Sequence, residues 1–407
     1  MSEMHRPWLC AADAARLLGV SRATLYAYVS RGFIRSQSSS GSTRERTYAH
    51  EDVERLRRRT EERRAPDKAA ARALHWGMPI LESSITLIDG RRLYYRGLDA
   101  TTLARARSLE EVAAWIWTGR FETASVTPSR DHPGLAARHV ASAIAAGRGV
   151  PFIARAQSLL AAAAAHDGGA MDTRPENVAR TGQHILRLLL RGAGAARVDA
   201  AHVALARAWT AAGRGGDILR TALVLCADHE LNVSSFTARC VASAGAHPYA
   251  VVIAGLAALE GPKHGGASAR VESMLESMRR ARPLRTAVRD RLRRGEAVDG
   301  FGHPLYQEGD PRAHLLMDLL AEHYATSAEW RFVREVAHTV AASTGEHPNV
   351  DFALAAVARV LRLPAGAPLM LFAIGRSVGW IGHAIEQYAT GQLIRPRAKY
   401  VGVAPMP

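Results

Sequence analysis

Cysteine is scarce in this chain, and its scarcity excludes two kinds of structural support. Only three cysteines occur among 407 residues, Cys10, Cys226 and Cys240, and no two of them form a CxxC pair. A disulfide framework needs several cysteines, and a zinc site built on thiolates usually needs closely paired ones. We therefore expect reduced, mostly buried thiols, with neither a disulfide scaffold nor a cysteine-bound metal.

Long apolar runs are missing as well. The longest, YAVVIAGLAAL at 249–259, falls well short of the roughly 20 residues that cross a bilayer. The N-terminal stretch MSEMHRPWLC lacks the apolar core of a signal peptide. We expect a soluble cytoplasmic protein, long enough for two or three domains and a large buried core.

Lysine is nearly absent, since only three of the 53 basic residues are lysine, while the formal net charge is +15. Basicity that comes almost wholly from arginine is weak evidence for a nucleic-acid partner. The distribution of charge is more informative, because residues 1–72 hold 15 of the basic residues and the other 335 residues hold 38. The basic surplus is therefore concentrated at the N-terminus.

The basic segment has the local signals of two helices joined by a tight turn. Gly19 ends a run of helix formers, Ser21 can cap a second helix, and Gly32 can stop that helix. The polar stretch SQSSSGSTRER then predicts a hairpin tip, and a third helix is expected to begin near His50.

In sequence, LLGVSRATLYAYVSRGFI and the later RTYAHEDVERL resemble the winged helix-turn-helix of MerR-type regulators and phage excisionases. In that family the second helix enters the major groove and the wing contacts phosphate. The resemblance implies DNA contacts from Arg22, Tyr26, Arg44 and Arg46. The regulators usually have arginine where Tyr26 stands, which changes the expected backbone contact. A docking module with solvated arginines is the alternative interpretation.

From about residue 75 the pattern becomes that of a large helical body. ITLIDGRRLYYRG at 85–97 alternates apolar and polar residues around Asp89-Gly90, which predicts a β-hairpin. The segments that follow show helical spacing or good helix formers, with glycine at several ends. No repeat of fixed period occurs, so we expect a mainly α fold rather than a solenoid.

Three histidines stand out in the body for their neighbours: His229 in ADHELNVSSF, His264 in GPKHGGAS and His303 in GFGHPLYQEGDPRA. Glycine beside a polar side chain permits close approach of a ligand to the backbone, at a cost in helix stability. Further on, Asp351 is expected at the start of a helix and Arg376 on a largely apolar one, where a buried arginine needs a carboxylate partner.

Two kinds of chemistry fit these residue types. Three histidines and a carboxylate can bind zinc, but their separations of 35 and 39 residues lack the short spacing that places two ligands on one helical face. Acid–base chemistry on a polyanionic substrate fits better, because arginines bind carboxylates, histidines donate to a carbonyl and an aspartate can accept a proton. We therefore predict no metal site.

Five further stretches, in order, resemble the signature segments of citrate synthase and 2-methylcitrate synthase, and the hairpin resembles the N-terminal hairpin of the same enzymes. These stretches are DHELNVSSFTARCVASAGAHPYAVVIAGLAALEGPKHGGA, GFGHPLYQEGDPRA, HPNVDF, GRSVGW and RPRAKYVG. The resemblance covers residues 75–403. It implies a large and a small helical domain after a winged helix-turn-helix. The expected ranges are 1–60 for the winged domain, 61–74 for a linker, 75–267 and 358–407 for the large domain, and 268–357 for the small one.

The resemblance also implies roles for individual residues. His264 would hydrogen-bond the thioester carbonyl of acetyl-CoA, Asp351 would remove the methyl proton, and His303 would polarise the ketone of oxaloacetate. Oxaloacetate would be held by His229, Arg312, Arg376 and Arg395. Arg395 would reach in from the second subunit of a homodimer. Acetyl-CoA is a co-substrate, and no metal or prosthetic group is needed.

Some positions depart from the family pattern. Gln307 replaces the usual basic residue that helps bind CoA phosphate, Pro304 replaces an arginine common in bacterial relatives, and Ala353-Leu354-Ala355 replaces a small Ser-Gly pair. We therefore keep three hypotheses: a citrate synthase, a 2-methylcitrate synthase that uses propionyl-CoA, and a DNA-binding sensor built on the same scaffold.

Overall fold

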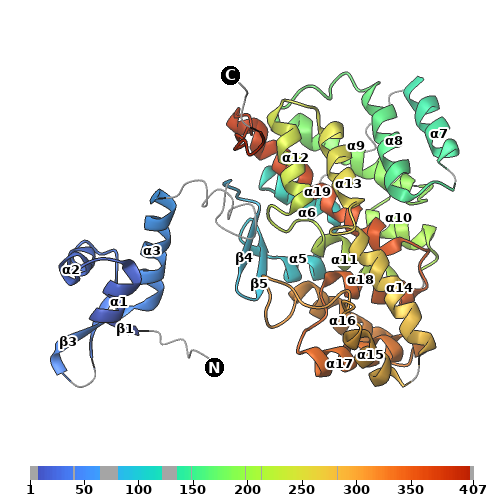
Figure 1. The fold of residues 1–407 in the computed structure, drawn as a ribbon. Coiled ribbons are helices and arrows are strands. Elements are labelled where there is room, and N and C mark those ends of the chain that lie inside the picture. The colour runs from blue at the N-terminus through green and yellow to red at the C-terminus, as the bar shows by residue number, and fades with distance from the viewer. Residues whose placement is uncertain are drawn as a thin grey trace. The chain divides into compact units, whose positions relative to one another are not determined.

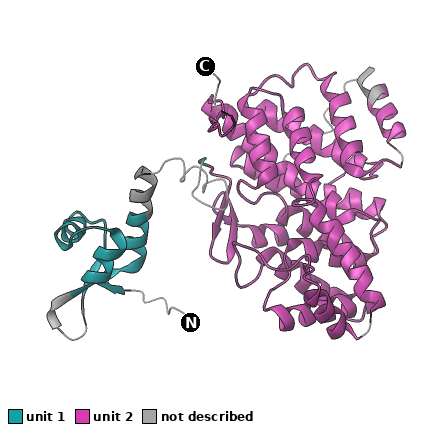
Figure 2. Ribbon diagram, viewed as in Figure 1, with its two compact units in different colours: residues 1–82 teal, residues 83–407 magenta. Residues whose placement is uncertain are grey.

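The computed structural model describes residues 8–39, 42–64, 81–121, 135–147, 149–197, 199–211, 213–281 and 283–403. The chain divides into two compact units, residues 1–82 and residues 83–407 (Figure 2). Each unit has its own hydrophobic core. In the described residues, no helix is both long and apolar enough to cross a membrane.

The first unit is a winged helix-turn-helix. Its elements are β1 (Trp8–Cys10), α1 (Ala11–Leu18), α2 (Arg22–Ser30), β2 (Ser36–Ser39), β3 (Ser42–Ala49) and α3 (His50–Arg64). The strands form an antiparallel sheet in the order β1-β3-β2, in which Ser36 lies opposite Tyr48. Gly19 ends α1 in the left-handed conformation, and Ser21 caps α2 by accepting the N–H of Thr24 at 3.2 Å. The predicted turn and caps are therefore confirmed.

The core of this unit is small. It contains Leu18, Leu25, Ile34 and Val53, each at most 7% exposed. The side chain of Asp52 is also buried, and it accepts hydrogen bonds from the backbone N–H of Arg35 at 2.9 Å and from Arg35 Nε at 2.7 Å. This contact joins the start of the wing to α3.

The second unit begins with the predicted hairpin. Its strands β4 (Thr86–Asp89), β5 (Arg92–Tyr95) and β6 (Leu98–Asp99) are antiparallel in this order, and Ile88 lies opposite Leu93. Tyr95 points inward and is fully buried, and its hydroxyl donates to the carbonyls of Val224 and Leu225 at 3.1 and 3.2 Å. The hairpin is therefore fastened to the end of α11 (Gly215–Leu225) in the helical body.

The described remainder of this unit is mostly helical, as predicted for a mainly α fold. The helices are α5 (Ala100–Ala106), α6 (Leu109–Thr118), α7 (Leu135–Ala146), α8 (Phe152–Ala164), α9 (Pro175–Gly192), α10 (Ala201–Ala208), α11 (Gly215–Leu225), α12 (Val233–Ser243), α13 (Pro248–Leu259), α14 (Gly266–Arg280), α15 (Leu284–Arg293), α16 (Pro311–Tyr324), α17 (Ala328–Thr344), α18 (Val350–Leu361) and α19 (Ala367–Thr390).

Helix α19 runs through the middle of this unit and contacts α6, α9, α11, α12, α13 and α18 (Figure 1). Two glycines allow its closest approaches. A Cβ at Gly375 would lie 2.5 Å from the carbonyl oxygen of Leu223, and one at Gly379 would lie 2.3 Å from Oδ1 of Asp228. The glycines of GRSVGW therefore place Arg376 against the end of α11, where the segment that carries His229 begins.

Candidate active site

Two loops far apart in sequence pair with each other and bring His303 close to the start of α18. Gly302 donates its N–H to the carbonyl of His347 at 2.9 Å, and Asn349 donates its N–H to the carbonyl of Gly300 at 2.9 Å. Gly300 has a positive φ of 86°, and a Cβ there would lie 2.9 Å from Cβ of Phe352. Only glycine allows this close approach.

His303 is held in one tautomer by its own loop. The backbone N–H of Leu305 donates to Nδ1 at 3.1 Å, so in the neutral ring Nε2 carries the hydrogen. Burial, followed by the positive charge of Arg312, lowers the pKa of His303 to about 4. The imidazole is therefore neutral near pH 7 and can donate from Nε2.

His229 lies beside His303 and is almost completely buried. The two ring centroids are 5.2 Å apart, and Nε2 of His229 is 3.0 Å from the hydroxyl of Tyr306. Burial lowers the pKa of His229 well below its usual value, and the charges of Arg312 and Arg376 act in the same direction. Tyr306, five residues before α16, thus links His229 to the His303 loop.

His264 immediately precedes the two glycines at the start of α14, and Ser234 fixes its ring. Its Nε2 is 2.9 Å from Oγ of Ser234, and the same oxygen accepts the indole N–H of Trp380 at 3.2 Å. That hydroxyl donates its own hydrogen to Oδ1 of Asn232 at 2.9 Å, so its contact with Nε2 orients the His264 ring without assigning the tautomer. Burial lowers the pKa of His264 to about 4, helped by the charge of Arg376.

Asp351 lies in the first turn of α18, as predicted. Asn349 caps this helix by accepting the backbone N–H of Asp351 at 3.0 Å, and Ser268 Oγ donates to Asp351 Oδ1 at 2.7 Å. Burial raises the pKa of the carboxyl above its usual value, although Ser268 and Arg312 act against this. A carboxylate with a raised pKa is a stronger base than an ordinary aspartate.

Arg312 is buried in the first turn of α16 and is paired with Asp310. Nε and Nη2 of Arg312 donate to the two carboxylate oxygens of Asp310 at 2.9 and 2.7 Å. Asp310 also accepts the backbone N–H of Val350 at 3.0 Å, next to Asp351. One carboxylate therefore holds both the arginine and the start of α18.

Arg376 is 1% exposed and has one described hydrogen bond, from Nε to the carbonyl of Cys226 at 2.9 Å. Within the described residues its Nη1 is buried and has no partner. Its guanidinium lies 4.6 Å from the ring centroid of Phe372, which is 5.9 Å from the ring centroid of His264. A buried guanidinium with an unsatisfied donor is suited to bind a carboxylate.

Arg395 stands apart from these groups. It is exposed on the irregular segment that follows α19, and no hydrogen bond or ion pair to it occurs within the described chain. Leu393 and Tyr400 on the same segment are 60% and 75% exposed.

The positions that depart from the family pattern differ in burial. Gln307 and Pro304 are exposed, whereas Ala353, Leu354 and Ala355 are fully buried.

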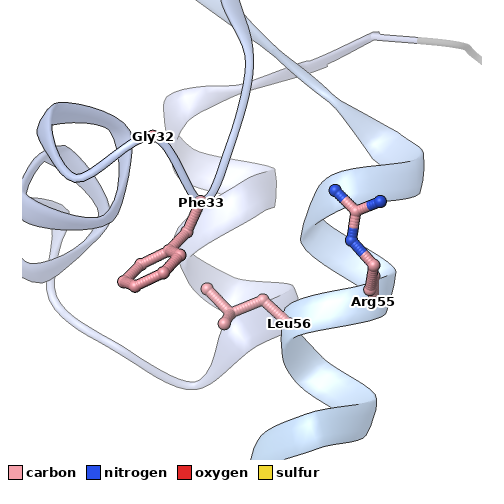
Figure 3. A pocket seen from close by; sticks show the side chains of 4 residues that line it. All are labelled: Gly32, Phe33, Arg55 and Leu56. Atoms are coloured by element: carbon pink, nitrogen blue, oxygen red, sulfur yellow. The ribbon is translucent and has the colours of Figure 1, made fainter.

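The candidate DNA contacts lie on the surface of the first unit. Arg22 and Arg46 are exposed, and Tyr26 is 51% exposed. The side chain of Arg44, on β3, lies outside the part that the structure describes. Arg22, Tyr26 and Arg46 do not line the hollow between the end of α2 and α3, where Phe33 and Leu56 point toward each other and Gly32 and Arg55 complete the lining (Figure 3).

Comparisons with known proteins agree with the geometry. Residues 73–397 match the family described as "Citrate synthase, C-terminal domain", and residues 11–60 match "MerR HTH family regulatory protein". The chain belongs to the citrate synthase family. The citrate synthase of Haloferax volcanii is 31% identical over 372 residues, which are 80% of this chain and 94% of that protein.

Other members of the citrate synthase family match over different lengths. Citrate synthase 2 of Bacillus subtilis is 38% identical, over 44% of this chain and 50% of its own length. The 2-methylcitrate synthase of Shewanella oneidensis is 29% identical, over 78% of this chain and 91% of its own length. The chain thus spans about half the length of some of the curated relatives it matches. The crystal structure of citrate synthase from Thermotoga maritima has a TM-score of 0.68 at 26% identity, covering 81% of this chain and 96% of that one.

Four residues of this site were missed from sequence: Ser234, Ser268, Tyr306 and Asp310. Each lies within a stretch singled out for its histidine or its arginine. Nothing in these stretches distinguished the four residues from their neighbours, and only the tertiary contacts of their side chains identify them. Among the described residues, no cluster of histidine, cysteine, aspartate and glutamate could hold a metal ion.

Proposed function

We propose that this member of the citrate synthase family condenses acetyl-CoA with oxaloacetate and hydrolyses the resulting thioester to citrate and CoA. The observation that carries the proposal is the combination of two neutral histidines and one basic carboxylate. His303 can donate from Nε2, His264 is a neutral ring oriented by Ser234, and Asp351 has a raised pKa. This arrangement supplies a base and two hydrogen-bond donors.

In the first step Asp351 takes a proton from the methyl group of the thioester while His264 donates to its carbonyl oxygen. A thioester methyl is a very weak acid, so the base needs simultaneous stabilisation of the oxygen that gains charge. One well-placed donor of this kind contributes about 3 to 4 kcal/mol. Ser234 serves this step by orienting the ring of His264.

In the second step the enol attacks the ketone of oxaloacetate. His303 polarises this ketone from Nε2, and His229 with Arg312 and Arg376 holds the dicarboxylate. The unsatisfied Nη1 of Arg376 supports its assignment as a carboxylate ligand. Water then hydrolyses the thioester, so the proposed chemistry requires no metal or prosthetic group, and closure of a small domain at 268–357 would exclude water during condensation.

The active unit is proposed to be a homodimer. Arg395 has no partner within the described chain and lies on an exposed segment with apolar side chains. In a dimer this segment would cover the second subunit and bring Arg395 to its oxaloacetate. Sedimentation should show a dimer. Arg395→Ala should weaken oxaloacetate binding without dissociating the dimer.

An assay of thiol release tests the reaction. We expect CoA to be released from acetyl-CoA and oxaloacetate, with a lower kcat/KM for propionyl-CoA. A tenfold or greater preference for propionyl-CoA would identify a 2-methylcitrate synthase instead. Binding of both substrates without release of CoA would favour the sensor hypothesis.

We propose DNA binding as a second function, located in the first unit. It is supported by the match to the MerR family and by the exposed positions of Arg22, Tyr26 and Arg46. On a two-fold dimer, two such units could bind a palindromic site. Arg22→Ala with Arg46→Ala should abolish retention of the full chain on selected DNA and leave CoA release unchanged. Equal retention of this variant and the parent protein would favour a docking module.

A further inference from the structure

The segment that carries His229 is irregular, so no helix or sheet fixes its course. It spans residues 226–232, between α11 and α12. Two hydrogen bonds to its backbone carbonyls fasten its start to α19: the side-chain Nε of Arg376 donates to the carbonyl of Cys226, and the backbone N–H of Gly379 donates to the carbonyl of Ala227, both at 2.9 Å. The residue directly before His229 is Asp228.

The side chain of Asp228 is fully buried between the hairpin and α19. Its Oδ2 accepts the hydroxyl of Thr86 on β4 at 2.6 Å, and its Oδ1 lies 3.2 Å from Nε2 of His383 on α19. The contact with His383 is close without being an aligned hydrogen bond. His383 is also fully buried. Asp228 therefore joins three parts of the chain that lie far apart in sequence.

Electrostatics alone does not explain a carboxylate at this position. Burial raises the pKa of Asp228, but His383, Arg376 and Thr86 together lower it below its usual value, so the group is charged near pH 7. A buried negative charge beside Arg376 opposes the binding of a dicarboxylate. We therefore look for a structural role of this carboxylate beside His229, one that offsets its electrostatic cost.

We propose that Asp228, held by Thr86 and His383, is a positioning residue that fixes His229 and Arg376 for the keto acid. The N-terminal hairpin is then part of the substrate site, because it supplies Thr86. This inference rests on the proposed function, since it assigns His229 and Arg376 to oxaloacetate. Thr86, Asp228 and His383 act through these two residues and do not touch the substrate.

Near-isosteric variants test the proposal through calorimetric binding of oxaloacetate to the full chain. Thr86→Val removes the hydroxyl, and we expect the Kd to rise about tenfold, the effect of losing one hydrogen bond to a charged group. Thr86→Ser keeps the hydroxyl and should restore the parent affinity. Thr221→Val is the matched control, because Thr221 is a buried threonine on α11 whose hydroxyl donates to the carbonyls of Ala104 on α5 and Asp217 on α11 and makes no hydrogen bond to Asp228.

Asp228→Asn separates positioning from charge. Loss of a negative charge near the site would tighten binding of the dianion, whereas loss of positioning weakens it, and we expect weaker binding. Parent-like affinity of Thr86→Val, or tighter binding by Asp228→Asn, overturns the inference and leaves the proposed function intact. If the unsubstituted protein itself does not bind oxaloacetate, the proposed function fails and the inference fails with it.

Discussion

Asp310 binds Arg312 through both carboxylate oxygens at 2.9 and 2.7 Å, and both side chains are buried, at 0% and 3% exposure. The same carboxylate holds the N-terminal end of α18 through the backbone N–H of Val350. The aspartate of GDPR is therefore one of the contacts between the loop that carries His303 and the helix that carries Asp351. Of this pair, the sequence analysis had singled out only Arg312.

Asp310→Asn should destabilise the protein and weaken oxaloacetate binding together. Removing one partner of a buried ion pair leaves an uncompensated charge, which costs about 3 to 5 kcal/mol. Urea unfolding measures the loss of stability, and the KM for oxaloacetate measures the loss of positioning. Glu329→Gln is a control, because Glu329 pairs with Arg279 and Arg359 in a partly exposed cluster, where we expect a smaller loss of stability and an unchanged KM.

Ser234→Ala should lower kcat about 10- to 100-fold, because one oriented hydrogen bond to the donor His264 is lost. Ser235→Ala is a matched control on the same helix. Ser235 is also fully buried, but its hydroxyl has no partner within the described residues. Thiol-release kinetics compare the two variants, and equal kcat values would show that Ser234 does not orient His264 for catalysis.

The two donor histidines should stay neutral well below pH 6. The pKa of His264 and of His303 is lowered to about 4, whereas an imidazole in the unfolded chain titrates near pH 6.5, about the model-peptide value. Nitrogen-15 spectra of labelled histidine check this, with His264→Gln and His303→Gln to assign the signals. Titration of either ring near pH 6.5 in the folded protein would contradict the proposed neutral donors.

Stability should depend on pH for the same reason. Between about pH 6.5 and pH 4 the unfolded chain binds more protons at these two positions than the folded protein does, so the free energy of unfolding falls as the pH falls. Above about pH 6.5 this contribution is fully present. Urea unfolding at pH 7 and at pH 5 measures the difference in the free energy of unfolding. This difference should be smaller in the variant that lacks both histidines.

Gly379→Ala should destabilise the protein by about 3 kcal/mol or more, since overpacking a tight core contact forces the backbone to move. The added Cβ would lie 2.3 Å from Oδ1 of Asp228 and 2.5 Å from the carbonyl of Ala227. Gly216→Ala on α11 is the control, because a Cβ there makes an ordinary contact at 3.7 Å. Thermal unfolding should show a neutral or stabilising effect for Gly216→Ala.

Local signals were sufficient for much of the fold. Ser21 and Gly19 predicted the helix-turn-helix because capping and left-handed turns depend on adjacent residues, and Asp89-Gly90 predicted the hairpin for the same reason. Apolar spacing predicted the helical body. The resemblance of the sequence motifs to known families is confirmed by the family matches, including the winged unit at 11–60.

The sequence by itself determined the mainly α fold, the winged unit and the set of charged and histidine side chains available for chemistry. Only the tertiary structure decided which atoms face one another: the hydroxyl of Ser234 and the ring of His264, Asp310 and the start of α18, and Thr86 with Asp228 and His383. The physical reason is that helices and turns follow from neighbours in the chain, whereas lowered pKa values and the contacts of Ser234, Asp310 and Asp228 depend on groups brought together from distant segments.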